Sequence, residues 1–309
     1  MNALVPDTNI NFLRLVKPFG FLSMALVIVS LVLIGTRGLN FGLDFTGGTV
    51  VEVGARSEVS LSEVRGALAD GGYSDATVQH FGSSRDVMVR VPPHDTDEPD
   101  QVGLEIFALI GAVVPDLDLR RVEFVGPQVG DELRDQSGLA MLIAMGLMMV
   151  YIWFRFTNKF GIAALIGLIH DVILVLGLFA LLQWSFDLTV LAAVLALIGY
   201  SLNDTIVVAD HIRDDFRNSR MTDAKAIINQ ALNRTLSRTL VTSLTTIMVL
   251  VALYFFGGET LRGFSASLIV GVAVGTYSTM YVVTGLLLIM KINKEEFMVP
   301  QAEELDERP

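Results

Sequence analysis

The sequence predicts a membrane protein, an all-α bundle of six transmembrane helices with one extracytoplasmic α+β domain inserted after the first helix. The first observation behind this fold class is composition: of 309 residues, 52% are hydrophobic, and the mean hydropathy is +0.57. Ordinary soluble domains are less apolar than this. The second observation is a set of six apolar runs, each close to the roughly 20 residues that a helix needs to cross a bilayer. The runs cover residues 19–36, 138–156, 161–182, 188–210, 239–256 and 264–290.

The first run follows a short polar arm, residues 1–18, which contains Arg14 and Lys17. A charged arm followed by an apolar run could be a signal peptide. No small-x-small cleavage site ends the run, which continues into Gly35-Thr36-Arg37, so we expect an uncleaved first span.

The segment 37–137 is predicted to be the one sizeable soluble domain. Its pattern is strand, helix, two strands joined by residues 82–85, helix and strand, and the first helix starts at a capping box, Ser60 to Glu63. This β-α-β-β-α-β order is the ferredoxin-like split pattern. The expected elements are residues 49–53, 60–70, 76–81, 86–91, 102–113 and 119–125. An acidic, proline-rich loop at 92–99 should be exposed, and the glycines in residues 126–130 should end the domain.

Lys and Arg in the short loops predict the orientation, because cytoplasmic loops are enriched in these residues. The arm, residues 155–159, the cytoplasmic loop 211–238 and the acidic tail 291–309 lie on one side, and the first three are rich in basic residues. The short loops on the other side contain a single basic residue, Arg262. Both termini are therefore expected in the cytoplasm, with the 37–137 domain outside.

Several function classes are disfavoured by composition. Most of the net charge of −11 falls in the soluble domain, which argues against a nucleic-acid partner. The chain has no cysteine, so it can hold no disulfide or thiolate metal site. It also lacks a phosphate-binding G-x-x-x-x-G-K-[ST] loop, so no ATP site is expected. We expect no enzymatic activity, no cofactor and no metal.

Asp204 is the leading candidate functional residue, because it lies inside the fourth apolar run. A carboxylate in the middle of a span costs about 2.5–3.5 kcal/mol on insertion scales. Ser201, Asp204 and Thr205 stand at i, i+3 and i+4 and so share one helix face. With Asn203, this face should look into protein or water. The alternative is a purely structural helix–helix hydrogen bond made by Asn203 and Asp204.

Two further sites of charge lie in neighbouring runs. Arg238, at the start of the fifth run, could reach inward and meet Asp204; alternatively, it is an anchor at the membrane interface. His170 and Asp171 are adjacent near the middle of the third run. They could relay protons, since histidine titrates near physiological pH, or simply satisfy each other.

Small and hydroxyl residues mark the last two runs and the start of the soluble domain. Thr242 and Thr245 form a hydroxyl stripe that could pack helices or line a wet path. Gly271 and Gly275 permit close helix approach. Before the first expected strand, Gly42-Leu43-Asp44-Phe45-Thr46-Gly47-Gly48 indicates a tight turn or close backbone approach.

These features occur together in a family of known proteins. The strongest motif is Gly199-Tyr200-Ser201-Leu202-Asn203-Asp204-Thr205-Ile206-Val207-Val208, and the Gly42–Gly48 segment, Phe81-Gly82-Ser83-Ser84, His170-Asp171 and the segment 238–246 also match. Across nearly the whole chain, the sequence resembles the SecF family of the bacterial SecD–SecF protein-export complex. Ala209-Asp210-His211 stands where members commonly have Phe-Asp-Arg, which affects contacts at the membrane edge only.

The resemblance implies a fold, partners and a mechanism. Such proteins pair with SecD, each contributing six spans to a pseudo-symmetric bundle related to the RND transporters. They work with the SecYEG channel and the SecA motor, and they use the proton motive force to pull preproteins across the inner membrane at a late stage. The resemblance assigns Asp204 and Arg238 to the proton path, and we expect Asn203, Thr205, His170 and Asp171 to belong to this path as well. Membrane lipid is the remaining implied contact.

Other functions stay open at this point. One is a small-molecule exporter of the RND type, although a single short soluble domain leaves little surface for a drug pocket. Another is an intramembrane aspartyl protease that uses Asp171 and Asp204, although their sequence settings do not match. A third is a scaffold for the channel, which predicts that Asp204 and Arg238 tolerate neutral replacement. The coupling ion could be a proton or sodium, since both suit a carboxylate.

Overall fold

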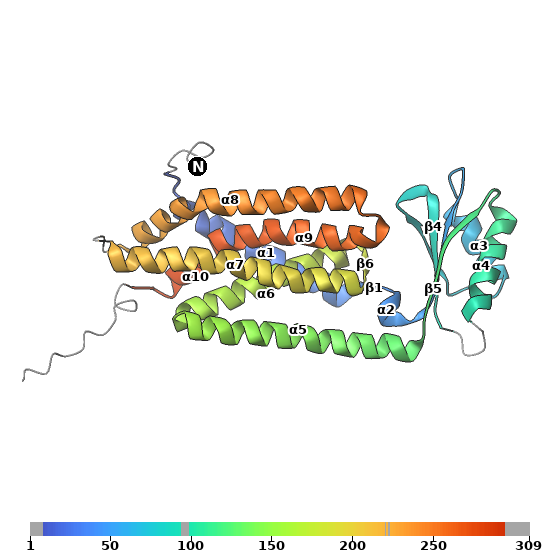
Figure 1. Ribbon diagram of the computed structural model, residues 1–309, viewed down its shortest axis with the longest axis horizontal. Coiled ribbons are helices and arrows are strands. Elements are labelled where there is room, and N and C mark those ends of the chain that lie inside the picture. Colours follow the sequence, from blue (N-terminus) through green and yellow to red (C-terminus); the bar gives the residue numbers. More distant parts are fainter. Residues whose placement is uncertain (1–8, 94–98, 220, 222, 294–309) are drawn as a thin grey trace, which may run out of the picture. The chain divides into compact units, whose positions relative to one another are not determined.

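The computed structural model describes residues 9–93, 99–219, 221 and 223–293, in two compact units (Figure 1). The first, the helical unit, comprises Met1–Leu39, Ile143–Gln183 and Ala192–Pro309, and the second, the α/β unit, comprises Asn40–Leu142 and Trp184–Leu191. The first eight residues of the predicted arm, residues 94–98 of the predicted acidic loop and residues 294–309 of the predicted acidic tail lie outside the described residues.

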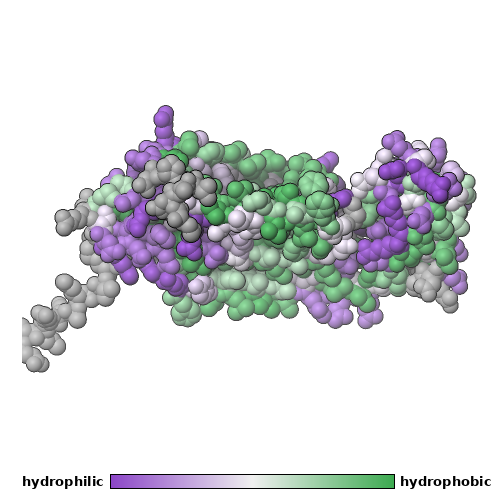
Figure 2. Space-filling model, turned by 45° about the horizontal axis from the view of Figure 1, so that its top comes forward, coloured by the Kyte–Doolittle hydropathy of each residue, from purple (hydrophilic) through white to green (hydrophobic). Residues whose placement is uncertain are grey.

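The helical unit is built from long apolar helices. Among the described residues, six helices are long and apolar enough to cross a membrane, which fits a membrane helical fold. Figure 2 shows hydrophobic residues over the middle of this unit and hydrophilic residues gathered at one of its ends. The helices are α1 (Leu13–Arg37), α5 (Pro127–Arg155), α6 (Asn158–Leu182), α7 (Leu188–Asn218), α8 (Ala224–Phe256) and a final helix in three parts.

Three of these helices extend well beyond the apolar runs. The segment expected as a loop at 211–238 is mostly helical, because α7 continues to Asn218 and α8 begins at Ala224. Apolar side chains explain this difference: Ile212, Phe216 and Ile228 are buried in a core cluster that continues from the ends of the spans, where it includes Val208 and Leu287. Likewise, the expected break at 126–130 is the start of α5, whose first residue is a proline, a favoured first helical residue.

The sixth run is not one regular helix. It consists of α9 (Glu259–Ser278), a π-helical turn η1 (Thr279–Val283) and α10 (Thr284–Ile289). Single π-helical turns inside α-helices are rare and are frequent at functional sites. The turn places the hydroxyl of Thr279, which is fully buried, against a neighbouring helix.

The α/β unit contains a four-stranded antiparallel sheet in the order β3-β4-β2-β5. Alternate residues of the strands, such as Val51 and Val89, pack with Leu68 and Ile106 of the two helices to form the hydrophobic core. The elements are β2 (Gly48–Gly54), α3 (Leu61–Asp70), β3 (Thr77–Phe81), β4 (Ser83–Val91), α4 (Pro99–Val113) and β5 (Asp118–Val125).

Local details of this unit differ from the sequence expectations. Strand β2, expected at residues 49–53, runs from Gly48 to Gly54 and is buried along its whole length. Strand β4 begins at Ser83, so the turn between β3 and β4 is Gly82 alone, with φ +81°. Ser60 does not cap α3 with its side chain; its Oγ lies 2.8 Å from the Oγ of Ser62 instead.

A second, two-stranded sheet was not expected from the sequence. Strand β1 (Asn40–Phe41) pairs in parallel with β6 (Ser185–Phe186), which lies just before α7. The short helix α2 (Leu43–Thr46) follows β1 and leads into β2. The pairing brings residues 184–191 into the α/β unit, although they are far from it in sequence.

Gly48 should be among the least replaceable residues of the α/β unit. Its φ of +109° is unfavourable for any residue with a Cβ atom, and an added Cβ would collide with the carbonyl oxygen of Val91. We expect Gly48→Ala to destabilise the protein by roughly 1–3 kcal/mol, the cost of a strained backbone position. Thermal unfolding of the full chain in detergent measures the effect.

Gly66→Ala is the matched control, because Gly66 lies on the exposed side of α3 with no atom near the added Cβ. That variant should be neutral or stabilised by about 0.5–1 kcal/mol, since glycine disfavours helix. Equal unfolding temperatures for Gly48→Ala and Gly66→Ala would contradict the strain at Gly48.

Candidate functional site

The carboxyl group of Asp204 is buried between α7 and α8. The residue is only 8% exposed, and the hydroxyl of Thr239 donates a 3.0 Å hydrogen bond to its Oδ1. Its Oδ2 has no hydrogen-bond partner among the described residues. A buried carboxylate oxygen without a donor is costly, which makes this atom a candidate for binding a proton.

The expected pairing of Asp204 with Arg238 is not formed. Among the described residues no ion pair joins the two side chains, and Arg238 is exposed in this chain. Arg238 directly precedes Thr239 on α8, so the hydroxyl, rather than the guanidinium, occupies the inward position beside Asp204. The difference arises because adjacent helical residues point in directions about 100° apart.

The polar face of α7 is divided among three neighbours. Ser201 donates a 2.5 Å hydrogen bond to Asp171 of α6, whereas Thr205 shares a 2.9 Å hydrogen bond with Thr279 of the π-helical turn. Both hydroxyl residues are buried, as their spacing predicts. Asn203, in contrast, is exposed in this chain and lies off this face.

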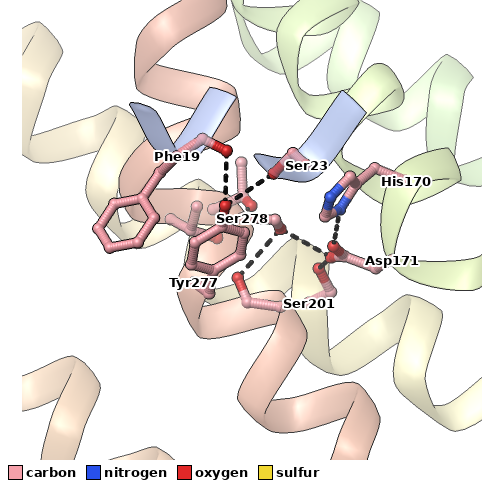
Figure 3. Close-up of polar contacts among 10 residues, drawn as sticks. Phe19, Ser23, His170, Asp171, Ser201, Tyr277 and Ser278 are labelled. Atoms are coloured by element: carbon pink, nitrogen blue, oxygen red, sulfur yellow. Dashed lines mark hydrogen bonds and ion pairs between the residues drawn. The ribbon is translucent and has the colours of Figure 1, made fainter. Parts of the chain in front are cut away.

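Asp171 is the centre of a second buried polar cluster (Figure 3). Its Oδ1 lies 2.9 Å from Nδ1 of His170, and its Oδ2 accepts hydrogen bonds from Ser201 at 2.5 Å and from Ser278 at 2.9 Å. Asp171 is fully buried and His170 is 5% exposed. Three helices, α6, α7 and α9, therefore meet at this carboxyl group.

One nitrogen of this cluster lacks a hydrogen-bond partner, and a tyrosine lies beside the cluster. Nε2 of His170 has no partner among the described residues. The ring of Tyr277 lies 6.4 Å from the imidazole, centroid to centroid. The Tyr277 hydroxyl is 2.8 Å from the hydroxyl of Ser23 and donates to the carbonyl of Phe19, both on α1 (Figure 3). These contacts extend the polar cluster from α6 to α1.

Gly271 and Gly275 allow α9 to approach α7 closely. A Cβ at Gly271 would lie 2.6 Å from a methyl group of Leu197, and a Cβ at Gly275 would lie 3.2 Å from Oγ of Ser201. Side chains at these positions would crowd α9 against α7, the helices that supply Ser278 and Ser201 to Asp171. Thr242 and Thr245, on exposed positions of α8, donate their hydroxyls back to carbonyls of their own helix.

The Gly42–Gly48 motif lies in the α/β unit and holds the beginning of α7. Asp44 accepts a 2.9 Å hydrogen bond from the backbone N–H of Leu188. The backbone N–H of Gly42 bonds the carbonyl of Phe186 at 2.7 Å. Gly47, with φ +65°, leaves room for the first residue of α5, Pro127, whose Cα would lie 3.0 Å from an added Cβ.

Sequence reasoning overlooked several residues of these clusters. A tyrosine inside an apolar run needs a partner for its hydroxyl, so Tyr277 could have been recognised. No sequence signal indicates the π-helical turn that places Thr279. Asp210 is bound by Arg155 and Arg213, and Asp215 is buried against Arg234, although no sequence pattern indicated these ion pairs. The described residues contain no group of three His, Cys, Asp or Glu side chains suited to a metal ion.

Comparison with protein families finds two matches. Residues 106–293 match the family described as "Protein export membrane protein SecD/SecF, C-terminal", and residues 32–59 match the "SecD/SecF GG Motif". The first match contains Asp171 and Asp204, the carboxyl groups at the centres of the two polar clusters. The second contains the whole Gly42–Gly48 motif.

Two SecF relatives are similar over nearly their full length. A protein translocase subunit SecF of Pseudomonas aeruginosa is 46% identical over 302 residues, covering 97% of this chain and 98% of the relative. The SecF subunit of Vibrio alginolyticus is 43% identical, with 99% of both chains covered. Among solved structures, SecDF of Thermus thermophilus, described as a translocon-associated membrane protein, has a TM-score of 0.85 and 35% identity. The similarity covers 92% of this chain and 39% of the SecDF chain.

Proposed function

Because this chain belongs to the SecF family, and is thus a multi-pass membrane subunit of the Sec protein translocase that associates with SecD, we propose that it couples protein export to the proton motive force. Together with SecD, it drives a late stage of the translocation of secreted proteins across the plasma membrane. The observation that carries the proposal is the buried carboxyl group of Asp204, which has one oxygen without a partner among the described residues.

In this mechanism Asp204 binds and releases a proton. When the carboxylate is charged, Thr239 and a reoriented Arg238 stabilise it; protonation neutralises it and releases Arg238. A unit charge that crosses 100 mV supplies about 2.3 kcal/mol. Inverting a two-state equilibrium from 1:99 to 99:1 takes about 5.5 kcal/mol, so a few protons suffice. The path extends from α7 to the buried His170–Asp171 pair of α6 through Ser201, and the buried Thr205 connects it to Thr279 of the π-helical turn.

The exposed polar residues of α7 and α8 support the partner assignment. Asn203, Arg238, Thr242 and Thr245 are exposed in this chain, although they lie in or next to membrane-spanning segments. Polar side chains at this depth rarely face lipid. We propose that SecD covers this surface, and that the pair acts with the SecYEG channel, the SecA motor and the preprotein in transit.

We also propose the orientation and the class of the inserted domain. Both termini lie in the cytoplasm and the α/β unit lies outside the inner membrane, as the distribution of Lys and Arg favours. The β2-α3-β3-β4-α4-β5 element order and the antiparallel strand order β3-β4-β2-β5 support a ferredoxin-like domain.

Ion-dependent export in membrane vesicles tests the proposed function. The vesicles contain this chain, its SecD partner and the translocation channel, and a preprotein already partly translocated is the substrate. We expect completion of translocation to depend on an imposed proton gradient and to stop when a protonophore removes it. A sodium gradient without a proton gradient is the control and should not support completion.

Each rival function predicts a different outcome. If completion of translocation depended on a sodium gradient alone, sodium and not the proton would be the coupling ion. If completion proceeded at the same rate with and without any gradient, the chain would serve only as a scaffold for the channel. A small-molecule exporter would show gradient-dependent drug efflux with no effect on preprotein completion.

A further inference from the structure

The Gly42–Gly48 motif, which the proton path does not use, supplies one of two carboxylates at the first turn of α7. Asp44 accepts from the backbone N–H of Leu188 at 2.9 Å. Asp187 accepts from the backbone N–H of Val190 at 2.8 Å and from the hydroxyl of Thr189 at 2.6 Å. The first N–H groups of a helix have no partner within the helix, and negative charge there is favourable. These two carboxylates therefore hold the end of α7 firmly.

Arg90 connects this helix end to the main sheet. It lies on β4, an inner strand of the four-stranded sheet. Its guanidinium donates to the carbonyl of Phe41 at 2.5 Å and to Oγ of Ser185 at 3.3 Å, so that it bridges β1 and β6. The negative charges of Asp187 and Asp44 both act on it.

The charge of Arg90 is constant under physiological conditions. Burial lowers the pKa of Arg90, while Asp187 and Asp44 oppose this change. An arginine nevertheless stays protonated in proteins, because its ordinary pKa lies far above physiological pH. The charge of Arg90 thus persists through any change of proton occupancy elsewhere in the chain.

Close packing surrounds the charged groups. The ring of Phe41 lies 5.9 Å from that of Phe45 and 6.1 Å from that of Phe186, centroid to centroid. Gly42 has no room for a side chain, since an added Cβ would lie 2.9 Å from the Cβ of Asp187. The motif, the β1–β6 pair and the first turn of α7 consequently form one packed assembly.

We propose that Asp44, Arg90 and Asp187, which we call the α7 joint, position α7 on the sheet and pass displacements of α7 to it. This inference rests on the proposed function, because α7 also carries Asp204. Asp204 is 16 residues beyond Leu188 in one continuous α-helix, about 24 Å at 1.5 Å per residue. A displacement of α7 caused by the proton on Asp204 therefore reaches its first turn, and the joint transmits it. Asp44, Arg90 and Asp187 are positioning residues and bind no proton of the path.

Arg90→Gln tests the joint by separating proton movement from export. In vesicles with the SecD partner and the channel, we expect gradient-driven completion of export to fall roughly tenfold, the change implied by losing one hydrogen bond to a charged group. Proton flux that depends on Asp204 should remain, which a merely destabilised protein would not show. Asp135→Asn, which changes a carboxylate 83% exposed on α5, is the matched control and should retain both.

A reversible covalent link keeps the test decisive if Arg90→Gln lowers the amount of folded protein. Asn40 and Ser185 are directly paired across β1 and β6, and the chain has no cysteine of its own. Adding Asn40→Cys and Ser185→Cys to Arg90→Gln should restore export under oxidising conditions and lose it again with reductant.

The outcomes separate the joint from the proton mechanism. Normal export by Arg90→Gln would overturn the joint and leave the proton mechanism intact, as would failure of the disulfide to restore export. Loss of proton flux in a folded Arg90→Gln complex would also overturn it, since the joint would then act on the path itself. Normal gradient-driven export by Asp204→Asn would instead overturn the proposed function.

Discussion

Replacing Asp204 by Asn should reduce preprotein export to the rate measured without a proton gradient. Asparagine has nearly the same shape and keeps an oxygen that can accept from Thr239, but it cannot gain or lose the proton. If one charge crossing 100 mV drives the step, the loss is about 2.3 kcal/mol. That corresponds to roughly 50-fold, because 1.4 kcal/mol is a factor of ten. Gradient-dependent completion of translocation in vesicles measures the effect.

Two companion measurements make this prediction specific. Asp214→Asn changes an exposed carboxylate on the same helix and should leave export unchanged. Copurification with SecD should be the same for wild type and Asp204→Asn, since Oδ1 alone makes the hydrogen bond to Thr239. Gradient-driven export at the wild-type rate in Asp204→Asn would refute a titrating carboxyl group at this position.

Replacing Asp171 by Leu should have the largest effect on stability. The change removes the acceptor for His170, Ser201 and Ser278 and leaves their polar groups buried between α6, α7 and α9. Breaking a buried charged network by removing one partner costs about 3–5 kcal/mol. Because whole proteins are stable by only about 5–15 kcal/mol, we expect little folded Asp171→Leu in the membrane. Thermal unfolding in detergent, followed by loss of the monodisperse complex, measures it.

Asp171→Asn distinguishes a structural role from a role in the proton path. The amide oxygen can still accept from Ser201 or Ser278, so the protein should be less destabilised than with leucine. If export then continues at the wild-type rate, the His170–Asp171 pair serves packing alone. A stable Asp171→Asn complex without gradient-driven export would place the pair in the proton path. An unfolding temperature for Asp171→Leu equal to wild type would contradict the network.

The membrane class follows from local properties of the sequence. Apolar runs of spanning length appear in the sequence directly, because a helix in lipid satisfies its own backbone and needs only apolar side chains. Helix and strand periods likewise indicated the elements of the inserted domain. The cost of a carboxylate in an apolar run singled out Asp204 before any contact was known. Helix ends were less predictable, as α7 and α8 show, because amphipathic extensions have no clear polar boundary.

Only the tertiary structure decided which groups meet. Spacing placed Ser201, Asp204 and Thr205 on one buried face, but it could not assign them to α6, α8 and the π-helical turn. It left open whether Arg238 meets Asp204, and it gave no indication that Thr239 is the partner. Strands as short as β1 and β6 have no periodic pattern to recognise, and their pairing joins residues far apart in sequence. Periodicity reports which face of an element is covered, whereas the neighbour that covers it depends on how the whole chain packs.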